Sequence, residues 1–199
     1  IFSALTIATF LSINTSVQAD YEGLNYRVTK NIEIEGQIYY SIDLFVEVES
    51  SNDRLLMVFG DSIFPLTLSA LDGGFYNNAL VNHLPHALSL DVVFGASIER
   101  DTFVTIGTDD SIKNGPATLQ FDTDSFENDD LFLLSNGSWY ILPVSETLGF
   151  PHDELGILIA RLTVREDQTI AGTINLTGRT EINGEVTPWT QNVLGETFI

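Results

Sequence analysis

Alternation of apolar and polar residues over residues 38–48 constrains this chain more than any other feature. One face of an extended strand would carry Ile38, Tyr40, Ile42, Leu44, Val46 and Val48, and the other Tyr39, Ser41, Asp43, Phe45 and Glu47. A sustained period of two indicates a β-strand with one buried face and one face mostly in water. Residues 31–35 alternate as well, and Gly36 can form a turn, so we expect a hairpin here.

Short segments of the same character recur along the chain. They predict further strands at residues 55–59, 64–69, 103–106, 117–121, 131–134, 139–142, 157–164, 169–176 and 186–189. Asn-Gly and Asp-Gly pairs occur among the breaks, and these pairs tolerate the positive φ that tight hairpin turns require. We expect residues 157–164 and 169–176 to pair as a hairpin. Residues 76–90 are expected to form a long loop, because Pro85 interrupts their weak helical pattern.

Many short strands without long helices define the expected fold class. The chain is predicted to be all-β, a single antiparallel β-sandwich of the jelly-roll or immunoglobulin/cohesin-like kind, with a barrel as the weaker option. No internal repeat and no linker rich in proline or serine divides it. We therefore expect one β-sandwich domain over residues 20–199.

Residues 1–19 differ from the rest, because they contain no charged side chain. An apolar run is followed by small and polar residues that end in Val17, Gln18 and Ala19. This pattern is typical of a secretory signal with its cleavage site, here without the basic n-region. A buried N-terminal strand or helix is the alternative. We expect an exported protein, secreted or at the cell surface, with no transmembrane segment.

Net charge and cysteine content exclude several classes of protein. The 199 residues include 8 Lys and Arg, 28 Asp and Glu, and no Cys, which gives a net charge of −20. Nucleic-acid recognition needs clustered Lys and Arg, so a nucleic-acid partner is not expected. A disulfide scaffold, a thiolate metal site and a cysteine nucleophile are excluded.

Catalytic motifs are not evident. The three histidines, His83, His86 and His152, lack the His-Glu-x-x-His spacing of zinc hydrolases and are expected to be surface or loop residues. There is no Gly-x-Ser-x-Gly sequence to mark a nucleophile. A glycosidase needs only two carboxylates, and sequence spacing cannot select such a pair among so many acidic residues.

The strongest polar cluster lies in residues 122–130. Its carboxylates are Asp122, Asp124, Glu127, Asp129 and Asp130, with no basic residue among them. An oxygen-rich loop suits calcium, which takes six to eight oxygen ligands. The spacing is not that of an EF-hand, and a solvated acidic loop is the alternative. Residues 108–111, with Asp109 and Asp110, form a second and poorer calcium candidate.

Aromatic residues beside polar turns are candidates for sugar binding. Trp139 and Tyr140 follow the turn at Asn136, and in a strand they point to opposite faces. We expect Trp139 in the core, because large apolar side chains fill sandwich interiors. Tyr140 and Trp189 are the candidates for ligand binding.

Four segments carry a resemblance to other proteins. They are residues 54–61 (RLLMVFGD), 103–107 (FVTIG), 136–140 (NGSWY) and 156–164 (GILIARLTV). Together they resemble a set of uncharacterised secreted all-β proteins from marine bacteria. The resemblance implies secretion and an all-β fold, and it carries no catalytic residue.

These observations favour an exported, non-catalytic β-sandwich module. Its role would be contact with an extracellular matrix, adhesion or carbohydrate, with calcium as a candidate ligand. The first alternative is a secreted carbohydrate-active enzyme, a glycoside hydrolase or lyase, on a jelly roll. The second is a self-assembling filament or coat subunit, which would show an unpaired edge strand or a large apolar patch.

Overall fold

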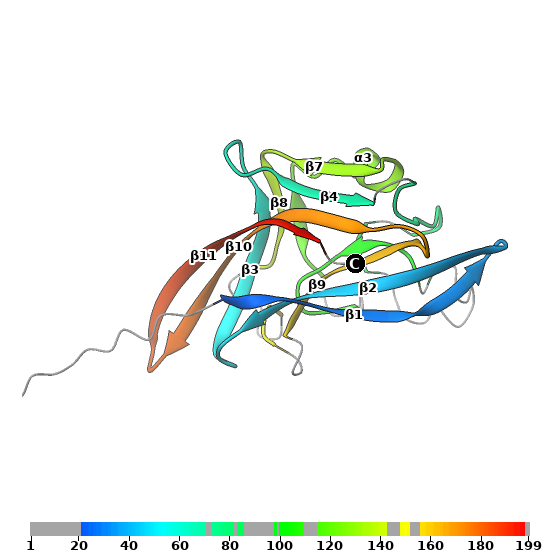
Figure 1. The fold of residues 1–199 in the computed structure, drawn as a ribbon. Coiled ribbons are helices and arrows are strands. Elements are labelled where there is room, and N and C mark those ends of the chain that lie inside the picture. Colours follow the sequence, from blue (N-terminus) through cyan, green and yellow to red (C-terminus); the bar gives the residue numbers. More distant parts are fainter. Residues whose placement is uncertain are drawn as a thin grey trace, which may run out of the picture.

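Two antiparallel sheets that pack against each other dominate the structure (Figure 1). The computed structural model describes residues 21–70, 73–81, 83–85, 98, 100–109, 115–142, 148–151 and 156–197. The predicted all-β sandwich is confirmed. The expected signal segment, residues 1–19, lies outside the described residues. No helix in the described part of the chain has the length and apolar character needed to span a membrane.

The smaller sheet has four strands in the order β1-β2-β9-β5. They are β1 (Tyr21–Ile34), β2 (Gln37–Val48), β9 (Ile157–Arg165) and β5 (Phe103–Val104). The expected hairpin around Gly36 is confirmed as β1–β2, and it is longer than predicted. Glu35 and Gly36 form its turn with φ of 52° and 81°, the positive values that a two-residue hairpin turn needs.

The larger sheet has seven strands in the order β6-β8-β3-β10-β4-β7, with β11 on β10. They are β6 (Ala117–Leu119), β8 (Gly137–Tyr140), β3 (Asp53–Gly60), β10 (Ile170–Ile182), β4 (Leu66–Ala70), β7 (Leu131–Leu134) and β11 (Glu185–Thr197). Strands β3 and β4 pair with successive parts of β10. Strands β8 and β7 continue one another in the same way beside β3 and β4. The sheet is therefore five lanes wide, with two lanes interrupted.

The interruption between β3 and β4 is residues 61–65, which we call the excursion. Asn175 of β10 lies opposite the break, and its side-chain amide donates to the carbonyls of Phe59 (2.9 Å) and Phe64 (2.6 Å). The Asp61 carboxylate accepts the N–H groups of Ile63 and Phe64, both at 2.7 Å. These bonds hold the two halves of the lane in one register.

The predicted hairpin of residues 157–164 with 169–176 is wrong. The first segment is β9 in the smaller sheet, and the second begins β10 in the larger sheet. Each segment has an apolar face. The two strands lie in different sheets, with their apolar faces in the common core, and they do not pair side by side in one sheet. Gln168 anchors the crossing, because its side chain accepts the N–H of Arg165 (3.0 Å) and its carbonyl accepts the Tyr40 hydroxyl (2.5 Å). Strand β10 forms its hairpin with β11, through a turn at Asn183 and Gly184.

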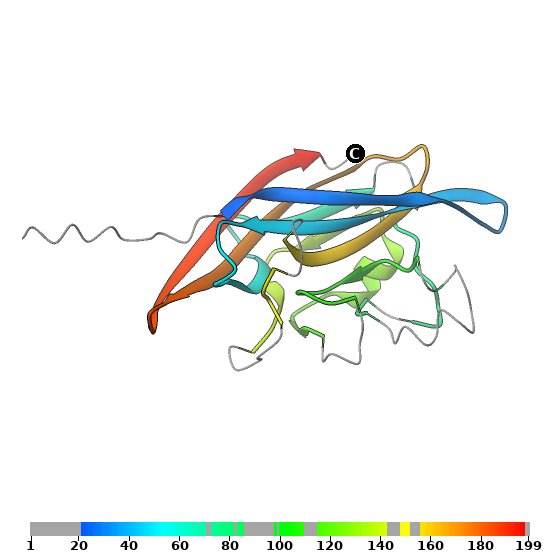
Figure 2. The same ribbon diagram turned by 90° about the horizontal axis from the view of Figure 1, so that it is seen from below.

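The two long hairpins, β1–β2 and β10–β11, reach out at opposite ends of the sandwich (Figures 1 and 2). Each leaves a long strand, β1 or β11, at the edge of its sheet. Pro188 lies within β11. Proline cannot donate a ladder hydrogen bond, and this is a common way to limit pairing at a sheet edge.

The interior of the sandwich is filled by side chains from both sheets. Trp139 is fully buried, which confirms its predicted core position, and its indole N–H donates to the Thr105 carbonyl (3.0 Å). An aromatic group closes one end of the core, where Phe126 and Phe132 meet edge to face with centroids 5.1 Å apart. Other fully buried core residues are Ile42, Leu44, Leu55, Leu66, Leu68, Ile106 and Ile157.

The predicted wet face of residues 38–48 is wrong for its central part. Ser41, Asp43 and Phe45 point away from the core as the alternation predicts, yet none of them is more than 4% exposed. Arg27 and Arg161 extend over this face, with their guanidinium groups above the rings of Phe45 (5.4 Å) and Phe103 (5.2 Å). Strand β2 is therefore buried on both faces there.

The fold predicts a strong requirement for glycine where β3 ends. A Cβ atom on Gly60 would lie 1.7 Å from the Leu134 carbonyl oxygen, so Gly60→Ala must displace backbone. We expect a loss of at least about 2 kcal/mol in urea unfolding. The control is Gly184→Ala, where φ is 83° but no atom lies within 4 Å. It should cost only about 1 kcal/mol. Equal losses in the two variants would contradict this account.

Candidate functional site

The acidic segment of residues 122–130 contains a helix, α3 (Thr123–Asn128), where a loop was predicted. Asp122 caps its first turn, with a carboxylate oxygen accepting the N–H of Ser125 (3.1 Å). An N-cap carboxylate satisfies a backbone donor that the helix leaves free. Asp122 therefore has a local structural role.

The five predicted calcium ligands do not converge as a group. Asp122, Asp124, Asp129 and Asp130 are exposed on α3 and beside it, whereas Glu127 is only half-exposed. In the described residues no three His, Asp or Glu side chains are arranged to hold a metal ion. Calcium binding by this segment stays a prediction. Of the poorer candidate, Asp109 is described and Asp110 lies outside the described residues.

Glu127 instead joins a group that was not predicted, which we call the carboxyl cluster: Asn77, His83, Asp101 and Glu127. The Asn77 amide donates to the carbonyls of Phe126 (3.3 Å) and Glu127 (3.0 Å). The N–H of His83 bonds to the Glu127 carboxylate. The charge of Glu127 acts on Asp101. Three segments that are far apart in the chain therefore meet here.

Each residue of the carboxyl cluster has a buried polar atom without a hydrogen-bond partner. These atoms are Asn77 Oδ1, His83 Nδ1, Asp101 Oδ2 and Glu127 Oε1. Asp101 has no exposed surface, although its other carboxylate oxygen accepts the N–H of Asn78 (2.6 Å). Buried polar atoms are nearly always paired, so four such atoms in one group need an explanation.

Burial changes the protonation of the cluster. Burial, with a smaller contribution from the charge of Glu127, raises the pKa of Asp101 to about 8, against hydrogen bonds from the backbone of Asn78 and Thr102. Burial also raises the pKa of Glu127, opposed by the N–H of His83. The pKa of His83 is lowered by burial. A neutral carboxyl at Asp101 is thus favoured near pH 7.

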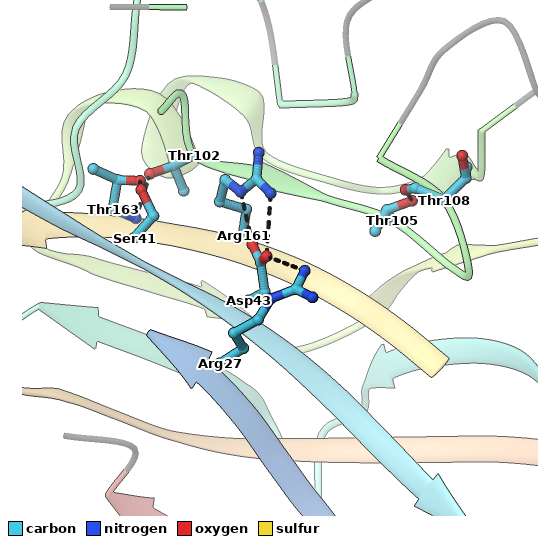
Figure 3. Close-up of polar contacts among 8 residues, drawn as sticks. All are labelled: Arg27, Ser41, Asp43, Thr102, Thr105, Thr108, Arg161 and Thr163. Carbon is cyan, nitrogen blue, oxygen red and sulfur yellow. Dashed lines mark hydrogen bonds and ion pairs between the residues drawn. The ribbon is translucent and has the colours of Figure 1, made fainter. Parts of the chain in front are cut away.

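A second buried carboxylate, Asp43, has the opposite surroundings (Figure 3). Arg161 binds it through two nitrogens, Nε to Oδ1 at 2.7 Å and Nη2 to Oδ2 at 3.1 Å. Arg27 adds a bond to Oδ2 at 2.9 Å. Burial alone would raise the pKa of Asp43, but the bonds and charges of Arg161 and Arg27 lower it. Asp43 is therefore a charged structural residue.

Hydroxyl groups continue this polar layer on both sides of Asp43 (Figure 3). Ser41 and Thr163 share a hydrogen bond of 2.6 Å across β2 and β9, and the Thr102 hydroxyl accepts the N–H of Thr163 (3.1 Å). The hydroxyl of Thr105 donates to the Thr108 carbonyl. Ser41, Thr102 and Thr163 have no exposed surface, so they cannot reach a substrate.

The two aromatic candidates differ in position. Trp189 in β11 lies over Gly178 of β10, where a Cβ atom would be 2.2 Å from its ring, and it packs partly against the core. Tyr140 lies half-buried on the opposite side of its sheet from Trp139, beside Met57 and Ala117. Of the two, Tyr140 is on an outer surface together with other outward residues. His86 and His152 lie outside the described residues.

That surface, which we call the outer face, is the side of the seven-stranded sheet that points away from the core. Its middle part carries no charged side chain among the described strand residues. Exposed leucines lie on it at Leu119, Leu131 and Leu133, and the excursion adds Ile63 and Phe64. By strand register its other members are Met57, Phe59, Thr67, Ser69, Ala117, Ser138, Tyr140, Ala171, Thr173, Asn175, Thr177, Thr190 and Asn192. Two of these residues, Ser138 and Asn175, are buried.

Charge is sparse on the outer face. Asp61 lies near its middle, at the base of the excursion, and its carboxylate accepts the N–H groups of Ile63 and Phe64. At the far end of β3 and β10, Arg54 pairs with Arg179 in the register. Arg54 is buried there and donates to the Leu148 carbonyl (2.9 Å). A surface with so little charge contrasts with the net charge of −20.

Sequence reasoning missed the carboxyl cluster and the outer face. Asp101 precedes a short strand, and Asn77 lies in a stretch predicted as loop, so no spacing connects them to Glu127. The outer face has a partial signal in the sequence. Residues 66–70 alternate between apolar and uncharged polar residues, and residues 131–134 are apolar at every position. Only the pairing register of β4 with β7 shows that the outward side chains of these two strands are neighbours.

Comparisons with known proteins give no relative for this chain: no family model, no curated protein and no solved structure matches it. Its function is therefore inferred from its own residues.

Loss of the Asp43 carboxylate should be strongly destabilising. Asp43→Asn leaves Arg161, which is 12% exposed, without its counter-charge. Breaking a buried pair of this kind costs about 3 kcal/mol, which urea unfolding would measure. The matched control is Asp167→Asn, because Asp167 is 74% exposed and meets Arg165 only at 3.8 Å. That change should cost less than about 0.5 kcal/mol, and a similar loss in both variants would refute the assignment.

Asp101 should make stability depend on pH. Its pKa is raised to about 8 from 3.8, so the folded protein holds a proton that the unfolded chain releases. The resulting stabilisation is complete below the unfolded pKa and is lost as pH rises toward 8, by up to about 1.4 kcal/mol per pH unit. Urea unfolding of wild type and Asp101→Asn in EDTA from pH 4.5 to 8.5 tests this. The difference between them should shift steadily in favour of the variant, and a constant difference would contradict it.

Proposed function

We propose that this chain is an exported, non-catalytic β-sandwich module of an extracellular matrix or adhesive layer, and that its outer face binds the outer face of a second copy. The observation that carries the proposal is the uncharged, partly apolar outer face on a strongly acidic protein. Residues 1–19, with the pattern of a secretory signal, support the extracellular location.

Charge favours a second copy as the occupant. Two molecules of net charge −20 repel each other wherever carboxylates meet, and like charges at an interface cost several kcal/mol. The strands in the middle of the outer face carry no carboxylate among the described residues, and the carboxylate of Asp61 beside them is bonded to the N–H groups of Ile63 and Phe64. Exposed apolar patches bordered by polar residues commonly mark protein contacts. A copy of the same face offers matching leucines and threonines, as a two-fold symmetric interface requires.

The area is sufficient for a stable contact. Four lanes with some 30 Å of strand length and the three-residue lane of β6, at about 4.8 Å spacing, give roughly 600 Å² per molecule. Stable interfaces bury about 800 Å² per partner. The excursion, with Ile63 exposed at its end, can add to this area. The estimate therefore supports a dimer of ordinary interface size.

Burial of two carboxyl groups, those of Asp101 and Asp43, supports a non-catalytic role over the enzyme alternative. A glycosidase needs a protonated carboxyl group at the scissile bond. Asp101 has the raised pKa of such a group, but none of its surface is exposed. Asp43 is held in its charged form by two arginines. Neither can touch a substrate in this arrangement.

Carbohydrate contact is the second candidate, because Tyr140 lies on the outer face next to hydroxyl-bearing residues. An aromatic ring with neighbouring polar groups can bind a neutral sugar. In that case Tyr140→Ala would abolish binding on a glycan array, while self-association of the protein would be absent.

The test is sedimentation of the protein at 10 to 100 µM. The wild type should dimerise, and more tightly in 0.5 M NaCl, which screens repulsion between the charged parts. Leu133→Glu should weaken dimerisation at least tenfold, because it places carboxylates in the interface. Val28→Glu is the control, since Val28 in β1 is 47% exposed and Leu133 is 50% exposed.

Two results would overturn the proposal. One is a wild type that stays monomeric at 100 µM in 0.5 M NaCl. The other is a dimer that Val28→Glu weakens as much as Leu133→Glu, which would assign the contact to the edge of β1. Circular dichroism of each variant checks that the sandwich is folded.

A further inference from the structure

We propose that Asp101, Glu127 and Asn77 of the carboxyl cluster form a binding site for one calcium ion. The site differs from the exposed acidic residues of α3, and it is independent of the proposed contact function. What points to it is the group of buried oxygen atoms that have no partner in the protein.

The free atoms have the chemistry of calcium ligands. Asp101 Oδ2, Glu127 Oε1 and Asn77 Oδ1 are two carboxylate oxygens and one amide carbonyl oxygen, and all three lack a hydrogen-bond partner. The Asn77 amide is oriented by its two bonds to the carbonyls of Phe126 and Glu127, so Oδ1 is the atom left free. Calcium takes carboxylate, amide and backbone oxygens together with water.

Charge balance favours a divalent cation. Asp101 and Glu127 carry two negative charges when ionised, and Glu127 is the one charged group that acts on Asp101 among the described residues. A buried carboxylate can also be neutralised by basic side chains, as at Asp43, where two arginines do so. A calcium ion would neutralise Asp101 and Glu127 together, and the desolvation cost of buried charge requires such a partner.

The ligand set does not suit zinc. Zinc in proteins prefers three or four nitrogen, sulfur or carboxylate ligands in a tetrahedron, and no such group of three side chains occurs in the described residues. The ring of His83 stacks on Phe121, with centroids 4.7 Å apart, which fixes it at the side of the cluster. Two carboxylates with an amide and water fit calcium, whose coordination is larger and more adaptable.

The frame around these ligands is already assembled. The Asp101 carboxylate accepts the N–H of Asn78, and the N–H of Thr102 donates to the Tyr76 carbonyl (3.1 Å). The N–H of Val104 donates to the His83 carbonyl (2.9 Å). The ligands therefore come from segments that are bonded to each other before the ion binds. Asn77 and Glu127 are partly exposed, so the site lies close to the protein surface.

The experiment measures thermal unfolding of the full chain in 1 mM EDTA, 2 mM CaCl₂ or 2 mM MgCl₂ at matched ionic strength, with calorimetric titration of CaCl₂. Calcium should bind one ion per chain and raise Tm by several degrees, and magnesium should do so much less. Asp101→Asn and Glu127→Gln should each abolish the calcium shift. Either variant serves if the other fails to fold.

The control is Asp124→Asn, an equal loss of charge at an exposed position of α3. It should keep the full calcium shift. The proposal is overturned if the wild type shows no calcium shift, or if Asp101→Asn and Glu127→Gln both retain it. Loss of the shift in Asp124→Asn alone would assign calcium to the exposed acidic segment. None of these outcomes depends on whether the outer face forms a dimer.

Discussion

Burial of β2 and β9 on both faces is the constraint on which the rest of the structure depends. One face of these strands fills the sandwich core. The other holds Ser41, Asp43 and Thr163 with almost no access to water, and Arg161, which is 12% exposed. Buried polar groups are tolerated only when they are paired. Arg161 and Arg27 neutralise Asp43, and the two hydroxyls bond to each other. Strands β2 and β9 can therefore be buried on both faces without losing stability to unpaired groups.

The distribution of basic residues explains why the two buried carboxylate sites differ. The chain has only 8 Lys and Arg against 28 Asp and Glu, and two of these arginines contact Asp43. Asp101 and Glu127 are held by backbone N–H groups instead, which supply partial charge but no counter-ion. A protein so poor in cations has limited means to neutralise buried acids from within. An external cation is the physical alternative, and the proposed calcium ion would supply it.

The same excess of acidic residues is the reason why the low charge of the outer face is informative. On a surface of mixed charge, an uncharged sheet face would be unremarkable, since many outward strand residues are threonines and serines. On this protein it is a region where a second molecule would meet few carboxylates. The proposed calcium site and the proposed contact face thus have a common origin in one property of the sequence. They lie on different elements and can be tested separately.

Local pattern was enough to predict the all-β class, most strand positions, the turn at Gly36 and the core position of Trp139. The physical reason is that period-two alternation and turn residues act over a few neighbouring residues. The helix α3 was not predicted although its N-cap, Asp122, is also local, because a helix of six residues is too short to show a helical period. Only the tertiary structure decided that β9 pairs with β2 and not with β10, and that the polar face of β2 is buried. It also decided that Asp101 meets Glu127, because packing between distant segments, which no local pattern encodes, brings them together.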